Sequence, residues 1–413
     1  MSSSSNSRWP LRLAAAALSV LAGASGGQAV AQEALRPEIG KPLQAAQELI
    51  RAQRFREALV KVREAEAAGA RGANETFLIE RMRIAAAAGS GDTDTAARSY
   101  EAISNSGRVS AADKQRMLES ISAGYYRSGQ YAKSMQWTQR YFKEGGSNPA
   151  FRTMLIQSQY QSGDFAGASR ELTAEIQAAE RAGASPSEDR LKLLLNAATR
   201  QGDNNAYVFA MEKLVTYYPK KEYWVDLLNR MQRKPSFSDR LSLDSYRLSL
   251  ATGSMTAASD FMEMAQLALQ AELPSESKQI VDKGFAVGAL GAGAEAERHK
   301  RLRDLVGKRL AADQAARADE LRQAEAAKTG EPLVSAGLNL VYSGDAAKGV
   351  ALIQQGIAKG GLKRPEDAKL HLGIAQLAAG DKAKAQATFK TVQGADGSSD
   401  LARLWSLYAR RNG

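Results

Sequence analysis

The stretch HLGIAQLAAGDKAKAQATF, residues 371–389, has the pattern of two short helices joined by Gly-Asp. Gly373 lies in the first helix, Gly380 at the turn, and Ala385 and Phe389 in the second helix. Because two antiparallel helices approach closely only where small side chains face each other, we expect Gly373 to meet Ala385 while Phe389 fills the seam. We also expect Gly380 to adopt a left-handed backbone conformation, which favours glycine.

The same spacing recurs along the chain. Gly337, Gly344 and Gly349 repeat the layout of Gly373, Gly380 and Ala385. A unit of two helices cannot bury its apolar face alone, so successive units are expected to stack and share a continuous core. The other predicted turn positions are Gly91, Gly129, Gly163 and Gly202, with degenerate matches at Gln53 and Glu272.

This pattern resembles the tetratricopeptide repeat family, whose helix-turn-helix unit is about 34 residues long. The resemblance covers most of residues 40–395. Pro219 and the Trp224-x-x-Leu227 motif match the end of one repeat and the opening of the next. The resemblance implies an all-α solenoid of helical hairpins wound into a right-handed superhelix, with roughly nine to ten helix pairs, some degenerate.

Three stretches depart from the regular repeat. Residues 230–260 keep helical periodicity without the turn glycine, and residues 294–327 predict a charged, Ala-rich helix longer than a repeat helix. The final stretch, residues 400–411, has apolar residues at core spacing and is expected to cap the last repeat. We therefore expect four segments. These are a signal peptide (1–31), an N-terminal helical array (32–290), a charged helical connector (291–330) and a C-terminal repeat pair with a capping helix (331–413).

The N-terminus has the features of an export signal. Arg8 and Arg12 precede an apolar run at residues 13–23, and Ala29-Val30-Ala31 is a small-x-small cleavage site. The run is shorter than the roughly 20 residues that span a bilayer, although a membrane anchor remains an alternative. We expect cleavage after Ala31 and, in a bacterium, a periplasmic protein without a transmembrane segment in the mature chain.

Few residues have the chemistry of a catalytic site. The chain has no cysteine, which excludes disulfides and thiolate chemistry, and it has two histidines. His299 is expected on a solvated basic face and His371 at the surface or in a groove. No phosphate-binding loop, zinc-protease motif or nucleophile elbow is present. We therefore expect no enzyme, cofactor or metal site, although paired carboxylates for glycan hydrolysis remain an alternative.

One helix offers a candidate peptide-binding face. Lys192, Asn196 and Arg200 recur at intervals of four residues, so they share one face. In the tetratricopeptide repeat family, a Lys and an Asn at such inner-face positions can begin a clamp for a peptide carboxylate. Lys192 and Asn196 match two of these positions, whereas Asp226 stands where another Asn would be needed. The alternative is that all three are ordinary exposed residues.

The charge of +11 favours anionic partners without identifying one. Anionic envelope polymers, phospholipid headgroups and an acidic protein would all fit, and solvated faces paired with nearby carboxylates are the alternative. We do not expect nucleic acid binding, because the chain has an export signal. One basic patch comprises Arg298, Lys300, Arg301 and Arg303, with Lys308 and Arg309 beyond it, and a second cluster comprises Lys220, Lys221, Arg230, Arg233, Lys234 and Arg240.

Together these features predict a non-catalytic scaffold or adaptor of the bacterial periplasm or cell envelope that binds a protein or peptide of the envelope. The alternative is a protein that binds an anionic envelope polymer, either peptidoglycan or exopolysaccharide, during envelope assembly or export.

Overall fold

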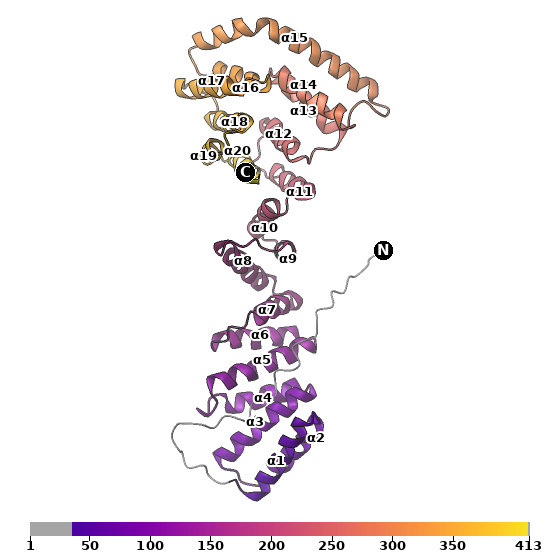
Figure 1. Cartoon of the computed structure of the whole chain (residues 1–413), viewed down its shortest axis with the longest axis vertical. Helices are drawn as coiled ribbons and strands as arrows, with labels where there is room; N and C mark the ends of the chain where they lie inside the picture. Colours follow the sequence, from indigo (N-terminus) through magenta and orange to yellow (C-terminus); the bar gives the residue numbers. More distant parts are fainter. Residues whose placement is uncertain (1–34, 412–413) are drawn as a thin grey trace. The chain divides into compact units, whose positions relative to one another are not determined.

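A computed structural model describes residues 35–411, and the predicted export signal with its cleavage site lies outside this range. Within it the chain is all-helical, with twenty α-helices, one 3-10 helix and no strand. The chain divides into two compact units (Figure 1). The first ends at Glu175 and includes Arg200–Gly202, and the second comprises Ile176–Thr199 and the chain from Asp203 onward.

Helices of the first unit pack mainly on their neighbours in the sequence, from α1 to α7. The helix α8 contains the boundary between the two units. These helices are α1 (Pro37–Arg51), α2 (Phe55–Glu66), α3 (Ala73–Ser90), α4 (Thr93–Ser104), α5 (Ala111–Arg127), α6 (Tyr131–Lys143), α7 (Pro149–Ser162) and α8 (Phe165–Arg181).

Several helices of the second unit lie outside the regular hairpin pattern. The divisions that we expect at residues 290 and 330 stay a prediction. The helices are α9 (Glu188–Gln201), α10 (Asn204–Tyr217), α11 (Lys221–Gln232), η1 (Asp239–Leu241), α12 (Ser242–Thr252), α13 (Ala258–Gln270), α14 (Pro274–Ala286), α15 (Ala296–Ala326), α16 (Glu331–Tyr342), α17 (Ala346–Lys359), α18 (Pro365–Ala378), α19 (Lys382–Phe389) and α20 (Ser398–Arg411).

All eight predicted turn positions have a positive φ, and each one lies between two consecutive helices. Gln53 and Glu272, both with φ of 58°, are the two non-glycine residues with positive φ in the described range. Their turns show that the repeat register persists where the glycine is lost. The other six are Gly91 (φ 85°), Gly129 (72°), Gly163 (86°), Gly202 (74°), Gly344 (97°) and Gly380 (83°).

Helices α11 and α12 pack on each other as a ninth, degenerate pair connected through η1. The all-α class, the hairpin repeat and the predicted number of pairs are therefore confirmed. The hand of a superhelix stays a prediction.

Small residues stand five positions after seven of the eight turns. A Cβ atom at Gly337 of α16 would lie 2.7 Å from the carbonyl oxygen of Gly349 on α17, so this crossing has no room for a side chain. Where serine replaces glycine, its hydroxyl bonds to the facing helix: Ser277 Oγ donates to the Ala265 carbonyl at 2.8 Å. The small residues are Ala58, Ala96, Ser134, Ala168, Ser277, Gly349 and Ala385, all buried, and the eighth position is Tyr207.

The crossing of α18 and α19 differs in one detail from the prediction. A Cβ atom at Gly373 would lie 2.3 Å from Cε1 of Phe389, and its three nearest atoms all belong to that ring. Gly373 therefore makes room for Phe389 rather than for Ala385, although Ala385 is fully buried as expected.

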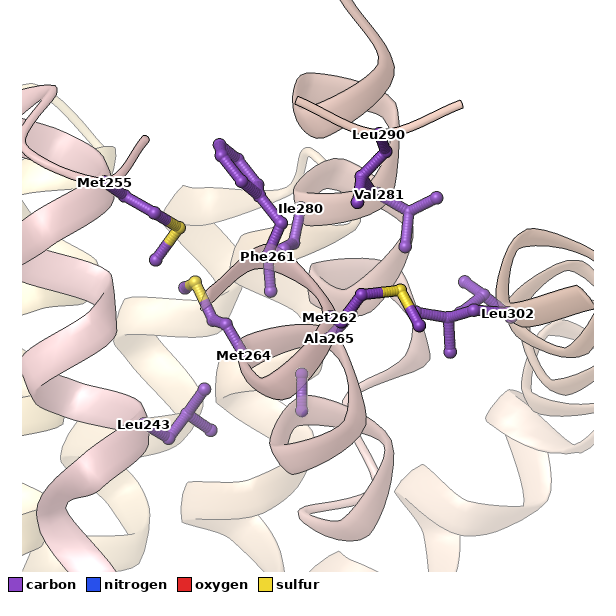
Figure 2. Close-up of a cluster of buried hydrophobic side chains, with 12 residues drawn as sticks. Leu243, Met255, Phe261, Met262, Met264, Ala265, Ile280, Val281, Leu290 and Leu302 are labelled. Carbon is purple, nitrogen blue, oxygen red and sulfur yellow. The ribbon is translucent and has the colours of Figure 1, made fainter. Parts of the chain in front are cut away.

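Helix α15 confirms the long charged helix predicted for residues 294–327, since it runs for 31 residues. Its N-terminal half is fixed by Leu302 and Val306, which pack into a cluster formed with α12, α13 and α14. Figure 2 shows Leu302 beside Met262 and Val281 in this cluster. Since these two apolar contacts lie on one side of α15, the remaining sides of its N-terminal half are free to face solvent.

The C-terminal helix α20 packs on α18 and α19 as the predicted cap, and it also packs on α10 and α12. Ion pairs join the same parts of the second unit. Lys234 Nζ lies 2.7 Å from Asp400, and Arg240 Nη2 lies 2.8 Å from Asp367 and 2.6 Å from Asp396. The end of the array therefore returns to its middle within this unit, which the sequence did not predict.

A Gly373→Leu substitution is expected to lower the free energy of unfolding by about 1–3 kcal/mol or more, because the new side chain overlaps the Phe389 ring. Urea unfolding of the full chain measures the change. Ala383→Leu, at an exposed position of α19, is the matched control and is expected to stay within about 0.5 kcal/mol of the unsubstituted protein. Equal stability of the two variants would contradict the close crossing.

Candidate interaction surface

The predicted peptide-binding residues lie along one exposed face of α9. Lys192, Asn196 and Arg200 are all exposed, whereas Leu191 and Leu194 on the other side of the helix are buried. Lys192 and Asn196 belong to the second unit, and Arg200 is grouped with the first. The shared exposed face is therefore present, and its role in binding stays a prediction.

Lys192 is held in place by a small polar network at the start of α9. Oε1 of Glu188 accepts hydrogen bonds from Tyr223 at 2.5 Å and Lys220 at 2.6 Å, and it forms an ion pair with Lys192 at 2.8 Å. These donors, Lys192 first, lower the pKa of Glu188 to about 2. Lys192 therefore helps to join α9 to the start of α11.

Asn196 and Arg200 differ from Lys192, because neither makes a side-chain hydrogen bond or ion pair within residues 35–411. Asp226, which stands where a clamp would need Asn, accepts a hydrogen bond from the hydroxyl of Tyr207. The guanidinium of Arg230 lies 3.7 Å from the centre of the same Tyr207 ring. Asp226 is therefore already engaged, whereas the side chains of Asn196 and Arg200 on α9 have polar groups that are available to a ligand.

The predicted basic patch of α15 divides into cations with and without partners. Lys300 lies 2.7 Å from Glu297, and Arg298 lies 3.3 Å from Glu295. The guanidinium of Arg303 stacks 4.6 Å from the centre of the Phe285 ring on α14. Arg301 makes no such contact with any residue in the described part of the chain. The four residues are therefore not one uniform patch.

Three of the six residues of the second basic cluster are paired with carboxylates within the chain. Lys220 bonds Glu188, Lys234 bonds Asp400, and Arg240 bonds both Asp367 and Asp396. For these three residues, the contacts favour the alternative of intramolecular pairing over attraction to an external anion.

Both histidines are more buried than ordinary surface residues, and His299 differs from the prediction of a solvated face. His299 is only 4% exposed rather than solvated, and its Nδ1 accepts a hydrogen bond of 3.1 Å from the backbone N–H of Gly291. Nε2 of His371 lies 3.0 Å from Oδ1 of Asp244, in a largely buried site rather than at an open surface. The first is explained by the Leu302 side of α15 facing the core, and the second by the contact of His371 on α18 with the buried Asp244 on α12.

A buried ionic cluster surrounds Arg247 of α12. Its guanidinium donates to Asp244 at 2.6 Å and to both carboxylate oxygens of Glu276 on α14 at 2.7 and 2.6 Å. It also lies 5.5 Å from the centre of the Tyr342 ring on α16. Burial by itself would raise the pKa of Asp244, but His371 and Arg247 outweigh it and hold that pKa well below its ordinary value.

Every ionised group in this cluster faces an opposite charge, so the cluster fixes α12, α14, α16 and α18 to one another. The only local sign of this cluster in the sequence was the Asp244-x-x-Arg247 spacing on one helix. The partners Glu276 and His371 lie 29 and 124 residues from Arg247. Sequence reasoning missed the cluster because nothing local indicates these distant partners.

Two kinds of feature are absent from the described part of the chain. Residues 35–411 contain no group of three or more His, Cys, Asp or Glu that could hold a metal ion. No helix in the same range combines the length and apolar character needed to cross a membrane.

Replacing Glu276 by Gln is expected to lower the free energy of unfolding by about 3–5 kcal/mol, because Arg247 would lose a buried partner. Asp282→Asn on the same helix is the matched control, since Asp282 is 52% exposed in its ion pair with Lys278. The control is expected to cost about 1 kcal/mol or less. Chemical denaturation of both variants measures the difference, and similar losses would argue against a buried network.

A Lys192→Ala substitution is expected to raise the pKa of Glu188 from about 2 towards its ordinary value of 4.5. The reason is that the carboxylate loses the partner that lowers this pKa most. Since the folded-state pKa is depressed, the stabilisation by ionised Glu188 is complete above pH 4.5 and is lost as the pH falls through about 2. Carbon NMR titration of the carboxylate measures the shift. Lys221→Ala should leave the pKa unchanged, and an unchanged value in Lys192→Ala would contradict the network.

Comparisons with known proteins add the following. No protein-family model matches the sequence, and no curated protein matches it. Among solved structures, the chain is similar to a tetratricopeptide repeat protein from Parabacteroides merdae, with 13% identity, 70% of this chain and 98% of that chain covered, and a TM-score of 0.22. It is also similar to yeast Tom70, with 10% identity, 91% and 96% coverage, and a TM-score of 0.24. Because these scores are low, the fold assignment rests on the chain's own turns and crossings, which make residues 35–411 a tetratricopeptide-like array of helical hairpins.

Proposed function

We propose that this protein is a non-catalytic scaffold that binds a protein or peptide partner of the cell envelope through the exposed face of α9. The observation that carries the proposal is that Asn196 and Arg200 are exposed on one helix face and are not used by any hydrogen bond or ion pair within residues 35–411. An amide beside a guanidinium suits a peptide backbone or carboxylate, because both present hydrogen-bond acceptors to the guanidinium.

Two further features support this proposal. Helical hairpin arrays commonly offer extended binding surfaces formed by successive repeats. The charged pattern before the apolar run at residues 13–23, followed by Ala29-Val30-Ala31, supports export to the periplasm and cleavage after Ala31.

The second candidate function is binding of an anionic envelope polymer, peptidoglycan or exopolysaccharide. The observation that favours it is the presence of cations on α15, such as Lys308 and Arg309, that make no hydrogen bond or ion pair in the described part of the chain. Ionic strength separates the two functions. Binding of a polymer through exposed cations should weaken steeply as salt shortens the range of electrostatic attraction, whereas peptide binding through hydrogen bonds and apolar contacts should weaken little.

The test uses a photocrosslinking amino acid at Asn196 in cells that export the protein, with the same amino acid at exposed Ala383 of α19 as the control. A discrete crosslinked protein is expected from Asn196 and not from Ala383. The double variant Asn196→Ala with Arg200→Ala should bind the identified partner at least about tenfold more weakly, since hydrogen bonds to a charged group are lost.

A matched double variant controls for the loss of an amide and a guanidinium elsewhere. Gln270→Ala with Arg127→Ala removes the same two groups at exposed positions of α13 and α5, and it should bind like the unsubstituted protein. Equal crosslinking from Asn196 and Ala383, or equal affinity of the two double variants, would rule out the α9 face as the binding site.

A further inference from the structure

The N-terminal half of α15 carries a face on which cations surround an apolar side chain. Its residues recur at intervals of three and four, so they lie along one side of the helix. All of them are exposed, and Leu305 is 45% exposed. The α15 face comprises Arg298, Arg301, Leu305, Lys308, Arg309 and Ala312.

The charge of the α15 face is only partly offset inside the protein, by Glu295 beside Arg298 and by Glu297 near Arg301. Arg301, Lys308 and Arg309 make no hydrogen bond or ion pair with any residue between 35 and 411. The ion pair of Arg298 with Glu295 spans 3.3 Å, and both side chains are 60% exposed, so solvent screens it strongly. This contrasts with Lys234 and Arg240, whose charges are bound to carboxylates.

The orientation of the α15 face is fixed by packing. His299, Leu302 and Val306 are each buried, and Leu302 and Val306 belong to the apolar cluster with α13 and α14. Each of these residues follows a member of the α15 face directly in the sequence, so the exposed and buried stripes run side by side along the helix. The cations and Leu305 are therefore presented together by a helix that is held in one rotation.

Leu305 distinguishes this face from a surface that is only charged. It is one of four large hydrophobic side chains exposed in the described residues, and it is the only leucine among them. A soluble polyanion would neutralise the cations but would leave Leu305 in water. A phospholipid surface offers phosphates for the cations and an apolar layer a few ångströms deeper for the leucine.

We propose that the α15 face docks the protein reversibly on an anionic phospholipid bilayer, with Arg301, Lys308 and Arg309 at the phosphates and Leu305 at the boundary of the acyl chains. The attraction depends on the negative charge of the lipid. Each Lys or Arg near the anionic surface adds to the binding free energy separately. This docking is independent of the peptide binding proposed for α9, which lies elsewhere in the sequence.

The experiment is sedimentation of the full chain with vesicles that mix phosphatidylglycerol and phosphatidylcholine, compared with vesicles of phosphatidylcholine alone. Binding is expected only to the anionic vesicles, and it should weaken as salt is raised. Arg301→Glu with Lys308→Glu should weaken binding by at least about thirtyfold. Leu305→Ala should weaken it by about fivefold, because less apolar surface enters the bilayer.

Matched controls separate the face from bulk charge and bulk hydrophobicity. Arg127→Glu with Lys143→Glu makes the same change of charge at exposed positions of α5 and α6. Val60→Ala shortens an apolar side chain that is 44% exposed on α2. Both control variants should bind anionic vesicles like the unsubstituted protein.

Three outcomes would overturn the proposal: no preference for anionic vesicles, equal binding by the α15 and control variants, or an undiminished affinity of Leu305→Ala together with equally tight binding of soluble polyglutamate. The last outcome would make the face a site for acidic chains in solution. Crosslinking from Asn196 is a separate readout, so a failure of vesicle binding would not affect the test of the α9 proposal.

Discussion

The constraint on which this structure depends is the close crossing of the two helices of each hairpin. A left-handed turn reverses the chain, and five residues later a small side chain lets the second helix approach the first. At Gly337 and Gly349 the approach is so close that a Cβ atom on either residue would overlap the facing backbone. Longer side chains further along the second helix, such as Ile353 and Phe389, then fill the seam. Because most hairpins share this arrangement, they can stack with similar faces.

Buried charge plays a different part from apolar packing in the second unit. Apolar clusters mainly join helices that lie near one another in the sequence, whereas other contacts reach the end of the chain. Arg240 of η1 pairs with Asp367 and Asp396, and Asp244 of α12 contacts His371 of α18. Desolvated ions cost free energy unless each one meets its partner in good geometry. These pairs therefore stabilise one particular return of α18 and α20 to the middle of the array, and alternative packings would leave ions unpaired.

The two candidate binding surfaces, on α9 and α15, consist of exposed side chains that are not used in packing. Asn196 and Arg200 on α9, and Arg301, Lys308 and Arg309 beside Leu305 on α15, make no hydrogen bond or ion pair within the described chain. Neither surface has the convergent polar groups of a catalytic centre. Both are rows along a helix, which suits extended ligands such as a peptide, or broad ones such as a bilayer.

The sequence by itself determined the hairpins, including the turns at Gln53 and Glu272. The reason is that turn conformation and small-residue spacing are local properties, and they recur along the chain. It also located the exposed row of α9 and the length of α15. Only the tertiary structure decided that Gly373 faces Phe389, that both histidines are largely buried, that Arg240 and Lys234 are neutralised, and that α20 returns to α10 and α12. The physical reason is that these features depend on partners far away in the sequence, and a charged residue has the same local pattern whether its partner is a distant carboxylate or solvent.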